Sequence, residues 1–170
     1  SASARGAYQF TNKSRRGKIG TYDIVVVAYE DAELTEDFVE GTQDLPNMIK
    51  AAICLLDMEL SKFPKEVHDL FAKDYELGSI FSVAAYNEGF GGARQLYQWI
   101  QKNKFELSLD KKIPQAAFIR YKPYFVRNKQ GKLVKAVKKV INTETQVYIE
   151  KHLFLWSFID DFKKQLKKGN

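Results

Sequence analysis

The chain has 170 residues, of which 45% are hydrophobic and 28% charged, and its formal net charge is +6. This composition is that of a globular protein and excludes a disordered or low-complexity chain. The single cysteine, Cys54, excludes an internal disulfide, and no apolar run approaches the roughly 20 residues that span a bilayer. The two histidines, His68 and His152, do not share a helical i,i+4 spacing, so we expect no metal site and no cofactor.

Positive charge is concentrated in the last third of the chain. Residues 119–170 hold 13 Lys and Arg against 4 Asp and Glu, a net of +9, whereas residues 1–117 have a net of −3. Such a segment favours an anionic partner, either nucleic acid, a membrane surface or an acidic wall polymer; the alternative is a solvated lysine face. Because no basic block is interleaved with aromatics as in an RNA-binding sheet, no nucleic-acid partner is expected, although a basic helical nucleic-acid module stays a minor alternative.

Helical periodicity dominates the sequence and predicts a mainly α fold. Four helices are predicted from apolar residues that recur at 3.6-residue spacing: 42–63, 76–88, 91–103 and 143–166. Thr42 is expected to cap the first of them, and Asn142 or Thr143 the last.

Two segments do not fit this pattern. Residues 22–29 are rich in β-branched side chains and could form either a strand or a buried helical turn. Residues 124–137 alternate weakly around Asn128-Lys129-Gln130-Gly131, which favours a small β-hairpin with a four-residue loop.

The most specific local signal is Ala85-Tyr86-Asn87-x-Gly89-x-Gly91. It indicates a helix that stops at a glycine and a tight turn into the next helix, so that side chains of the last turn can project into a cleft. Taken alone, such a pattern favours an ordinary helix C-cap with a core tyrosine. Glu88, within the motif, is expected to be a surface charge.

Two further motifs flank this one in a fixed order. Gly6-Ala7-Tyr8-Gln9 precedes it and Glu144-Thr145-x-x-Tyr148 follows it. The ordered set resembles the lytic transglycosylase (SLT) domain of the lysozyme-like superfamily, over nearly the whole chain. The resemblance implies one lysozyme-like helical domain over residues 1–170, in which the segment 120–139 is long for the family and would be an insertion.

The resemblance also implies a reaction. The family cleaves the β-1,4 bond between N-acetylmuramic acid and N-acetylglucosamine, and closes the sugar's own 6-hydroxyl onto C1 to give 1,6-anhydro-muramic acid. One glutamic acid serves as acid and then as base, so no second carboxylate is required.

Each motif then has an expected role in the glycan groove. By resemblance, Tyr86 orients the acid, Gln9 and Asn87 bind the glycan, and Glu144 and Tyr148 close the groove from the last helix. Gly6, Tyr8 and Ala85 complete the substrate-binding segments.

The acid itself is expected upstream of Ser1, in a Glu-Ser pair that the family places before Gly6. The sequence therefore predicts a peptidoglycan lytic transglycosylase domain of the bacterial cell envelope, periplasmic and N-terminally truncated. The alternative is a catalytically inactive relative that binds glycan strands or acts as a scaffold in the envelope.

The remaining candidates favour ordinary structural roles. His68 is expected on the surface in a polar loop, and His152 in the core with its hydrogen bonds satisfied. Cys54 is expected to be a small core residue. Trp99 and Trp156 could stack on sugars, but their helical positions favour packing.

Overall fold

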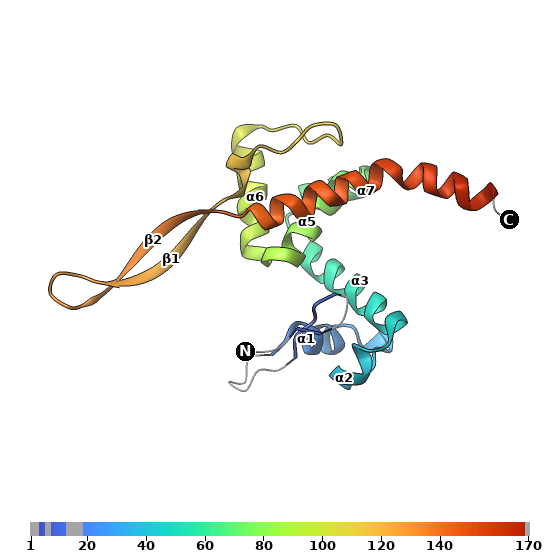
Figure 1. Cartoon of the computed structure of the whole chain (residues 1–170), viewed down its shortest axis with the longest axis horizontal. Helices are drawn as coiled ribbons and strands as arrows, with labels where there is room; N and C mark the ends of the chain where they lie inside the picture. The colour runs from blue at the N-terminus through green and yellow to red at the C-terminus, as the bar shows by residue number, and fades with distance from the viewer. Residues whose placement is uncertain (1–3, 6–7, 13–18, 169–170) are drawn as a thin grey trace. The chain divides into compact units, whose positions relative to one another are not determined.

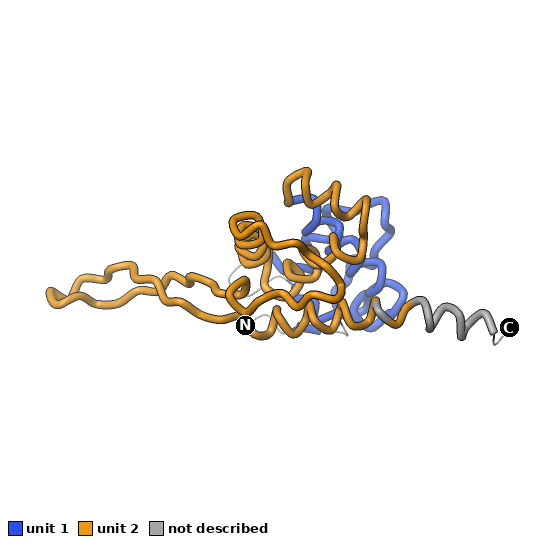
Figure 2. Tube along the Cα trace, turned by 90° about the horizontal axis from the view of Figure 1, so that it is seen from above, with its two compact units in different colours: residues 1–62 blue, residues 63–170 orange. Residues whose placement is uncertain are grey.

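The structure, a computed structural model, describes residues 4–5, 8–12 and 19–168 (Figure 1). Within these residues it has seven α-helices and one two-stranded antiparallel sheet, which confirms the predicted mainly α fold with a small hairpin. The chain divides into two compact units, residues 1–62 and 63–170 (Figure 2). The single lysozyme-like domain over 1–170 stays a prediction.

The first unit contains α1 (Thr21–Ala28), α2 (Phe38–Gly41) and α3 (Leu45–Ser61), with a 3₁₀ turn at Glu30–Ala32. The β-branched segment 22–29 is thus helical. Tyr22 lies at the centre of this unit, fully buried between the rings of Phe10 and Phe38. Its hydroxyl donates to the Thr35 carbonyl at 2.6 Å and accepts from Asn47 Nδ2 at 2.7 Å, which satisfies the buried polar group.

The predicted cap of α3 was wrong. Asp44, not Thr42, caps the helix: its carboxylate accepts the backbone N–H of Asn47, the third helical residue, at 3.1 Å. Thr42 instead ends α2, where its hydroxyl donates to the Phe38 carbonyl at 2.6 Å. Two cap-forming residues stand two positions apart, and the short helix α2 takes the first of them.

The second unit contains α4 (Lys65–Lys73), α5 (Tyr75–Glu88), α6 (Phe90–Asn103), a 3₁₀ turn at Gln115–Phe118 and α7 (Thr143–Lys168). The predicted helices 76–88, 91–103 and 143–166 are confirmed to within two residues at each end. Helix α7 begins as expected, because Asn142 Oδ1 accepts the Thr145 N–H at 3.2 Å.

Helix α4 was missed, and the predicted loop around His68 was wrong. Pro64 precedes the helix and Glu66 lies in its first turn, both of which favour a helix start. The helix has only nine residues, and its apolar positions span little more than one turn, which is too short a run to stand out in the sequence. His68 is half-buried, with Nε2 3.1 Å from the Phe63 carbonyl oxygen.

Strands β1 (Ile119–Arg127) and β2 (Leu133–Ile141) pair antiparallel from Ile119 opposite Ile141 to Arg127 opposite Leu133. The hairpin is therefore confirmed, and it is longer than the predicted 124–137. Its turn is ordered: Asn128 Oδ1 accepts from the backbone N–H groups of Gln130 and Lys132, and Gly131 has a φ of +73°.

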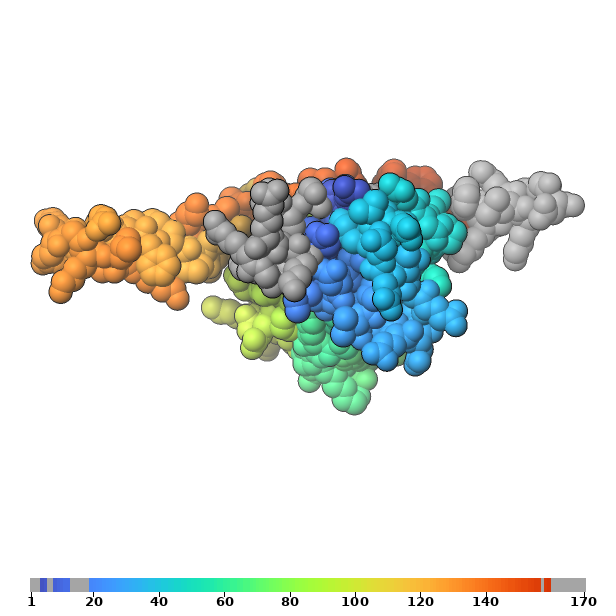
Figure 3. Space-filling view, turned by 90° about the horizontal axis from the view of Figure 1, so that it is seen from below, coloured from blue at the N-terminus to red at the C-terminus, as the bar shows by residue number. Residues whose placement is uncertain are grey.

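We call this hairpin, residues 119–141, the arm. It extends away from the helices of its own unit (Figure 2), and the space-filling view shows its outer part as a narrow projection (Figure 3). Beyond Arg120 the strand residues are almost all exposed, so only the base of the arm is held by the helices. No helix in the described part of the chain is long and apolar enough to cross a membrane.

Candidate functional site

Two of the three sequence motifs meet in the second unit. The Asn87 side chain, in the last turn of α5, contacts the first turn of α7 through both of its polar atoms. Its Oδ1 accepts from Thr145 Oγ1 at 2.6 Å, and its Nδ2 lies 3.4 Å from Glu144 Oε1. Thr145 is fully buried and Glu144 is exposed, so the pair of bonds sits at the boundary between core and solvent.

Three further motif residues lie on the same two helices. Tyr148 lies one helical turn beyond Glu144 on the same side of α7 and is 42% exposed. Tyr86 is half-buried beside Asn87 in the sequence. Ala85 is buried, and its carbonyl accepts the Gly89 N–H at 2.8 Å, so it serves to end α5.

The first motif belongs to the other unit. Arg5 and Phe10 form an isolated antiparallel bridge, with N–H···O distances of 2.8 and 3.0 Å, and thereby close the turn that carries Tyr8 and Gln9. Gln9 is exposed and has a φ of +53°, a left-handed conformation that is strained for a residue with a side chain. Gly6 lies outside the described residues.

The strongest polar cluster of the second unit was not predicted as such. Glu88 was expected on the surface, and this was wrong: its side chain is 7% exposed and that of Arg120 only 3%. Arg120 Nη2 and Nε donate to the two carboxylate oxygens at 2.7 and 2.9 Å, and Asn142 Nδ2 donates to Oε2 at 2.7 Å. Glu88 therefore ties the end of α5 to the base of the arm and to the start of α7.

The three glycines that follow Glu88 differ in what a side chain would meet at each position. A Cβ on Gly92 would overlap the Glu88 carboxylate, so the missing side chain makes room for the ion pair. A Cβ on Gly91 would meet nothing within 4 Å, so packing against the described residues does not require this glycine. Gly89 has a φ of +78° and a ψ of 160°, a conformation that favours glycine.

His152 has the satisfied environment that was predicted for it, although it is half-buried. Trp156 Nε1 donates to its Nε2 at 3.0 Å, and the Ser79 hydroxyl lies 2.6 Å from the same atom. Because the indole N–H can only donate, Nε2 is an acceptor here and the ring is neutral, with its proton on Nδ1.

This arrangement predicts a pH dependence of stability. Burial lowers the pKa of His152 below its ordinary 6.5, so the unfolded chain binds a proton at a higher pH than the folded chain does. Stability should therefore be complete above about pH 6.5 and decrease as the pH falls below it. Thermal unfolding between pH 5 and 8 should show this decrease, and His152→Gln should reduce it; an equal decrease in the variant would contradict the assignment.

Cys54 is buried, as predicted. Trp99 and Trp156 are half-buried, and each packs against another ring. The ring centroids of Trp99 and Phe105 are 5.9 Å apart, and those of Trp156 and Tyr75 are 5.0 Å apart. Within the described part of the chain, no three His, Cys, Asp or Glu side chains are grouped so that they could hold a metal ion.

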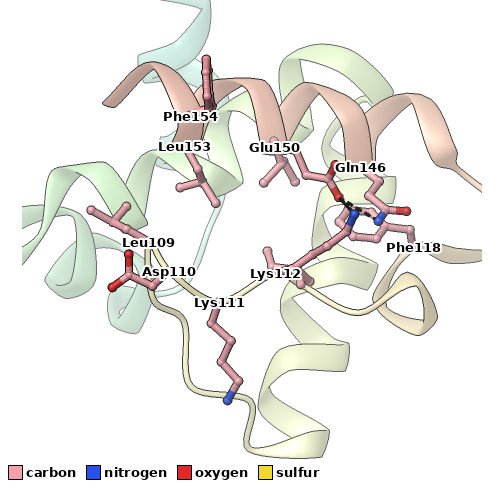
Figure 4. A pocket seen from close by; sticks show the side chains of 11 residues that line it. Leu109, Asp110, Lys111, Lys112, Phe118, Gln146, Glu150, Leu153 and Phe154 are labelled. Atoms are coloured by element: carbon pink, nitrogen blue, oxygen red, sulfur yellow. Dashed lines mark hydrogen bonds and ion pairs between the residues drawn. The ribbon is translucent and has the colours of Figure 1, made fainter. Parts of the chain in front are cut away.

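A cavity of about 430 Å³ lies on another side of α7, between that helix and the segment 109–113 (Figure 4). Lys112 Nζ reaches across it to Glu150 Oε1 at 2.9 Å, and this bond holds the pKa of Glu150 below its ordinary value. Gln146 donates to the same oxygen. None of the motif residues lines this cavity.

Comparison with protein-family models, with curated proteins and with solved structures finds no match for this chain.

Proposed function

We propose that this chain is a peptidoglycan lytic transglycosylase domain of the bacterial cell envelope, acting in the periplasm. The observation that carries the proposal is the contact of Asn87 with Glu144 and Thr145. These two residues lie 57 and 58 positions after Asn87 in the sequence, so the contact joins two separate motifs. Motifs matched by chance need not have side chains in contact, and these two motifs do, as a shared glycan groove requires.

The open surface at Gly91 gives a second, weaker support. A glycine in a helix costs about 1 kcal/mol relative to alanine, and no neighbour in the described structure requires it here. Close approach of a ligand to the backbone explains such a glycine, and the family motif has one at this position.

The proposed chemistry divides the work among the residues. The glycan supplies its own nucleophile, the 6-hydroxyl, and one carboxylic acid protonates the leaving oxygen and then takes the proton of that hydroxyl. Within the second unit, Asn87 would hold acetamido and hydroxyl groups, Tyr86 would orient the acid, and Glu144 with Tyr148 would bound the groove. The acid would lie in a Glu-Ser segment upstream of Gly6.

The test compares binding and cleavage. Residues 1–170 are expected to sediment with purified sacculi but to release little or no 1,6-anhydro-muropeptide, measured by mass spectrometry. A longer chain that carries an upstream Glu-Ser segment should release it, and Glu→Gln in that segment should lower the rate by about 10²–10⁴-fold, the usual contribution of general acid–base catalysis.

The outcomes separate the alternatives. Binding without cleavage by the longer chain would favour the inactive glycan-binding or scaffolding relative. Cleavage by residues 1–170 alone would place the acid within the chain, and Glu144→Gln would then be the first variant to assay. Absence of binding and cleavage by both chains would overturn the proposal.

A matched pair of amide variants tests the groove. Asn87→Ala is expected to weaken binding to sacculi by up to about tenfold, since it removes the side chain proposed to hold the glycan and one neutral hydrogen bond is worth about 0.5–1.5 kcal/mol. Asn103→Ala removes an exposed amide that donates to the Trp99 carbonyl at 2.8 Å, at the opposite end of α6 from Gly91, and should leave binding unchanged.

A further inference from the structure

The arm is strongly basic. Residues 119–141 hold eight Lys and Arg and no Asp or Glu. Arg120 is neutralised in its buried pair with Glu88, which leaves seven cations on the arm. The density of one charge sign favours an anionic partner.

The strand register sorts the arm into two faces, because residues opposite each other across the strands point to the same side. One face, which we call the aromatic face, places an aromatic ring opposite a lysine twice: Tyr121 opposite Lys139, and Phe125 opposite Lys135. Basic and aromatic residues are therefore interleaved on the arm, and the expectation from the sequence that no basic block is interleaved with aromatics was wrong. The opposite face places Lys122 opposite Lys138. The aromatic face consists of Ile119, Tyr121, Pro123, Phe125, Arg127, Leu133, Lys135, Val137, Lys139 and Ile141.

The aromatic face leaves much apolar area in water. Phe125 is 69% exposed, Leu133 64% and Tyr121 62%. Val137, on β2, lies opposite the position between Tyr121 and Phe125 on β1. Contiguous exposed apolar area of this kind marks an interaction surface. The partner must therefore accept apolar side chains and positive charge on the same face.

These two requirements exclude several partners. A second copy of the chain would bring a like-charged arm against this one, which is unfavourable. A nucleic acid offers phosphates to the lysines and bases to the rings, but it gives no apolar environment to Leu133, Val137 and Ile141. The headgroup region of a bilayer offers both phosphates and the edge of the acyl chains.

We propose that the arm is a membrane-binding element that lies flat, with its aromatic face down, on an anionic lipid surface. Phe125, Tyr121 and Leu133 then enter the boundary between headgroups and acyl chains. Lys135, Lys139 and Arg127 keep their alkyl stems at that boundary and extend their charges to the lipid phosphates. The polar turn at 128–132 gives no reason for insertion by the tip. This inference does not rest on the proposed function.

The test measures sedimentation of the full 170-residue chain with vesicles. Binding is expected to vesicles of 30 mol% phosphatidylglycerol in phosphatidylcholine, and to fall at least 100-fold on pure phosphatidylcholine, since each lysine or arginine near an anionic surface contributes about fivefold. Raising the salt to 0.5 M should weaken it similarly. No binding to the anionic vesicles would overturn the proposal, as would tighter binding to a 20-nucleotide oligomer at the same salt.

Neighbouring residues on opposite faces give the matched control. Tyr121→Ser with Phe125→Ser is expected to weaken vesicle binding at least tenfold, whereas Tyr124→Ser with Val126→Ser, from the opposite face, should change it less than threefold. All four side chains are exposed, so circular dichroism should show both variants folded. Equal effects of the two variants would show attraction by charge alone and would overturn the face-down arrangement.

Discussion

Glu88→Ala is expected to lower the free energy of unfolding of the second unit by about 3–5 kcal/mol, the usual cost of leaving one partner of a buried ion pair alone. Arg120 would keep its bonds to the Ala117 and Ile119 carbonyls, at 2.7 and 3.2 Å, but its charge would be buried without a counter-charge. Asn142 would also lose its acceptor, so the start of α7 would be less firmly held. Urea denaturation followed by circular dichroism measures the change.

An exposed ion pair supplies the control. On the surface of α4, Lys65 Nζ lies 2.7 Å from Asp69 Oδ2, and the two side chains are 82% and 61% exposed. Lys65→Ala should cost no more than about 0.5 kcal/mol, because solvent screens the pair. A similarly small cost for Glu88→Ala would show that water replaces the carboxylate and that the cluster is not an anchor.

Gly92→Ala should destabilise the same unit by about 1–2 kcal/mol, the cost of overpacking less what alanine gains in a helix. The new methyl group would overlap the Glu88 carboxylate, which Arg120 and Asn142 hold from the other side. Either the ion pair shifts or α6 moves away from the end of α5, and overpacking of this kind costs about 1–3 kcal/mol. Thermal unfolding is the simplest measurement.

Gly91→Ala, one position earlier in the same helix turn, should leave the stability unchanged or raise it by up to about 1 kcal/mol, because its methyl group would meet open space. Equal destabilisation by both substitutions would assign the effect to the helix start rather than to Glu88.

The sequence predicted the long helices well because each carries an apolar stripe of its own. Helices α5, α6 and α7 each begin within two residues of the expected position. Helix α4 was missed because its nine residues are mostly polar and its apolar positions span little more than one turn. The segment 22–29 stayed ambiguous because its β-branched residues favour strands locally, whereas packing around Tyr22 decides the helix, and that packing comes from residues far away in the sequence.

The candidate site was predictable only in part. Motif order suggested that residues near 87 and 144 belong together, and the structure brings Asn87 and Glu144 within 3.4 Å. The burial of Glu88 could not be predicted, since its partners Arg120 and Asn142 lie 32 and 54 residues away and nothing local distinguishes it from a surface glutamate. The face-by-face arrangement of lysines and rings on the arm likewise depends on a register that the weak alternation did not define.

The way the arm is fixed has a consequence for how such chains can diversify. The chain leaves the helical body at Ile119 and returns at Ile141, directly opposite, and the fixing contacts are made by Arg120 at one end and Asn142 at the other. The length of the segment between these points has little effect on the stability of the helices, because the free-energy cost of closing a loop rises only slowly with its length. Residues 121–140 can therefore be replaced as a unit. A short turn or a different hairpin can connect residues 120 and 141 while α5, α6 and α7 keep their structure.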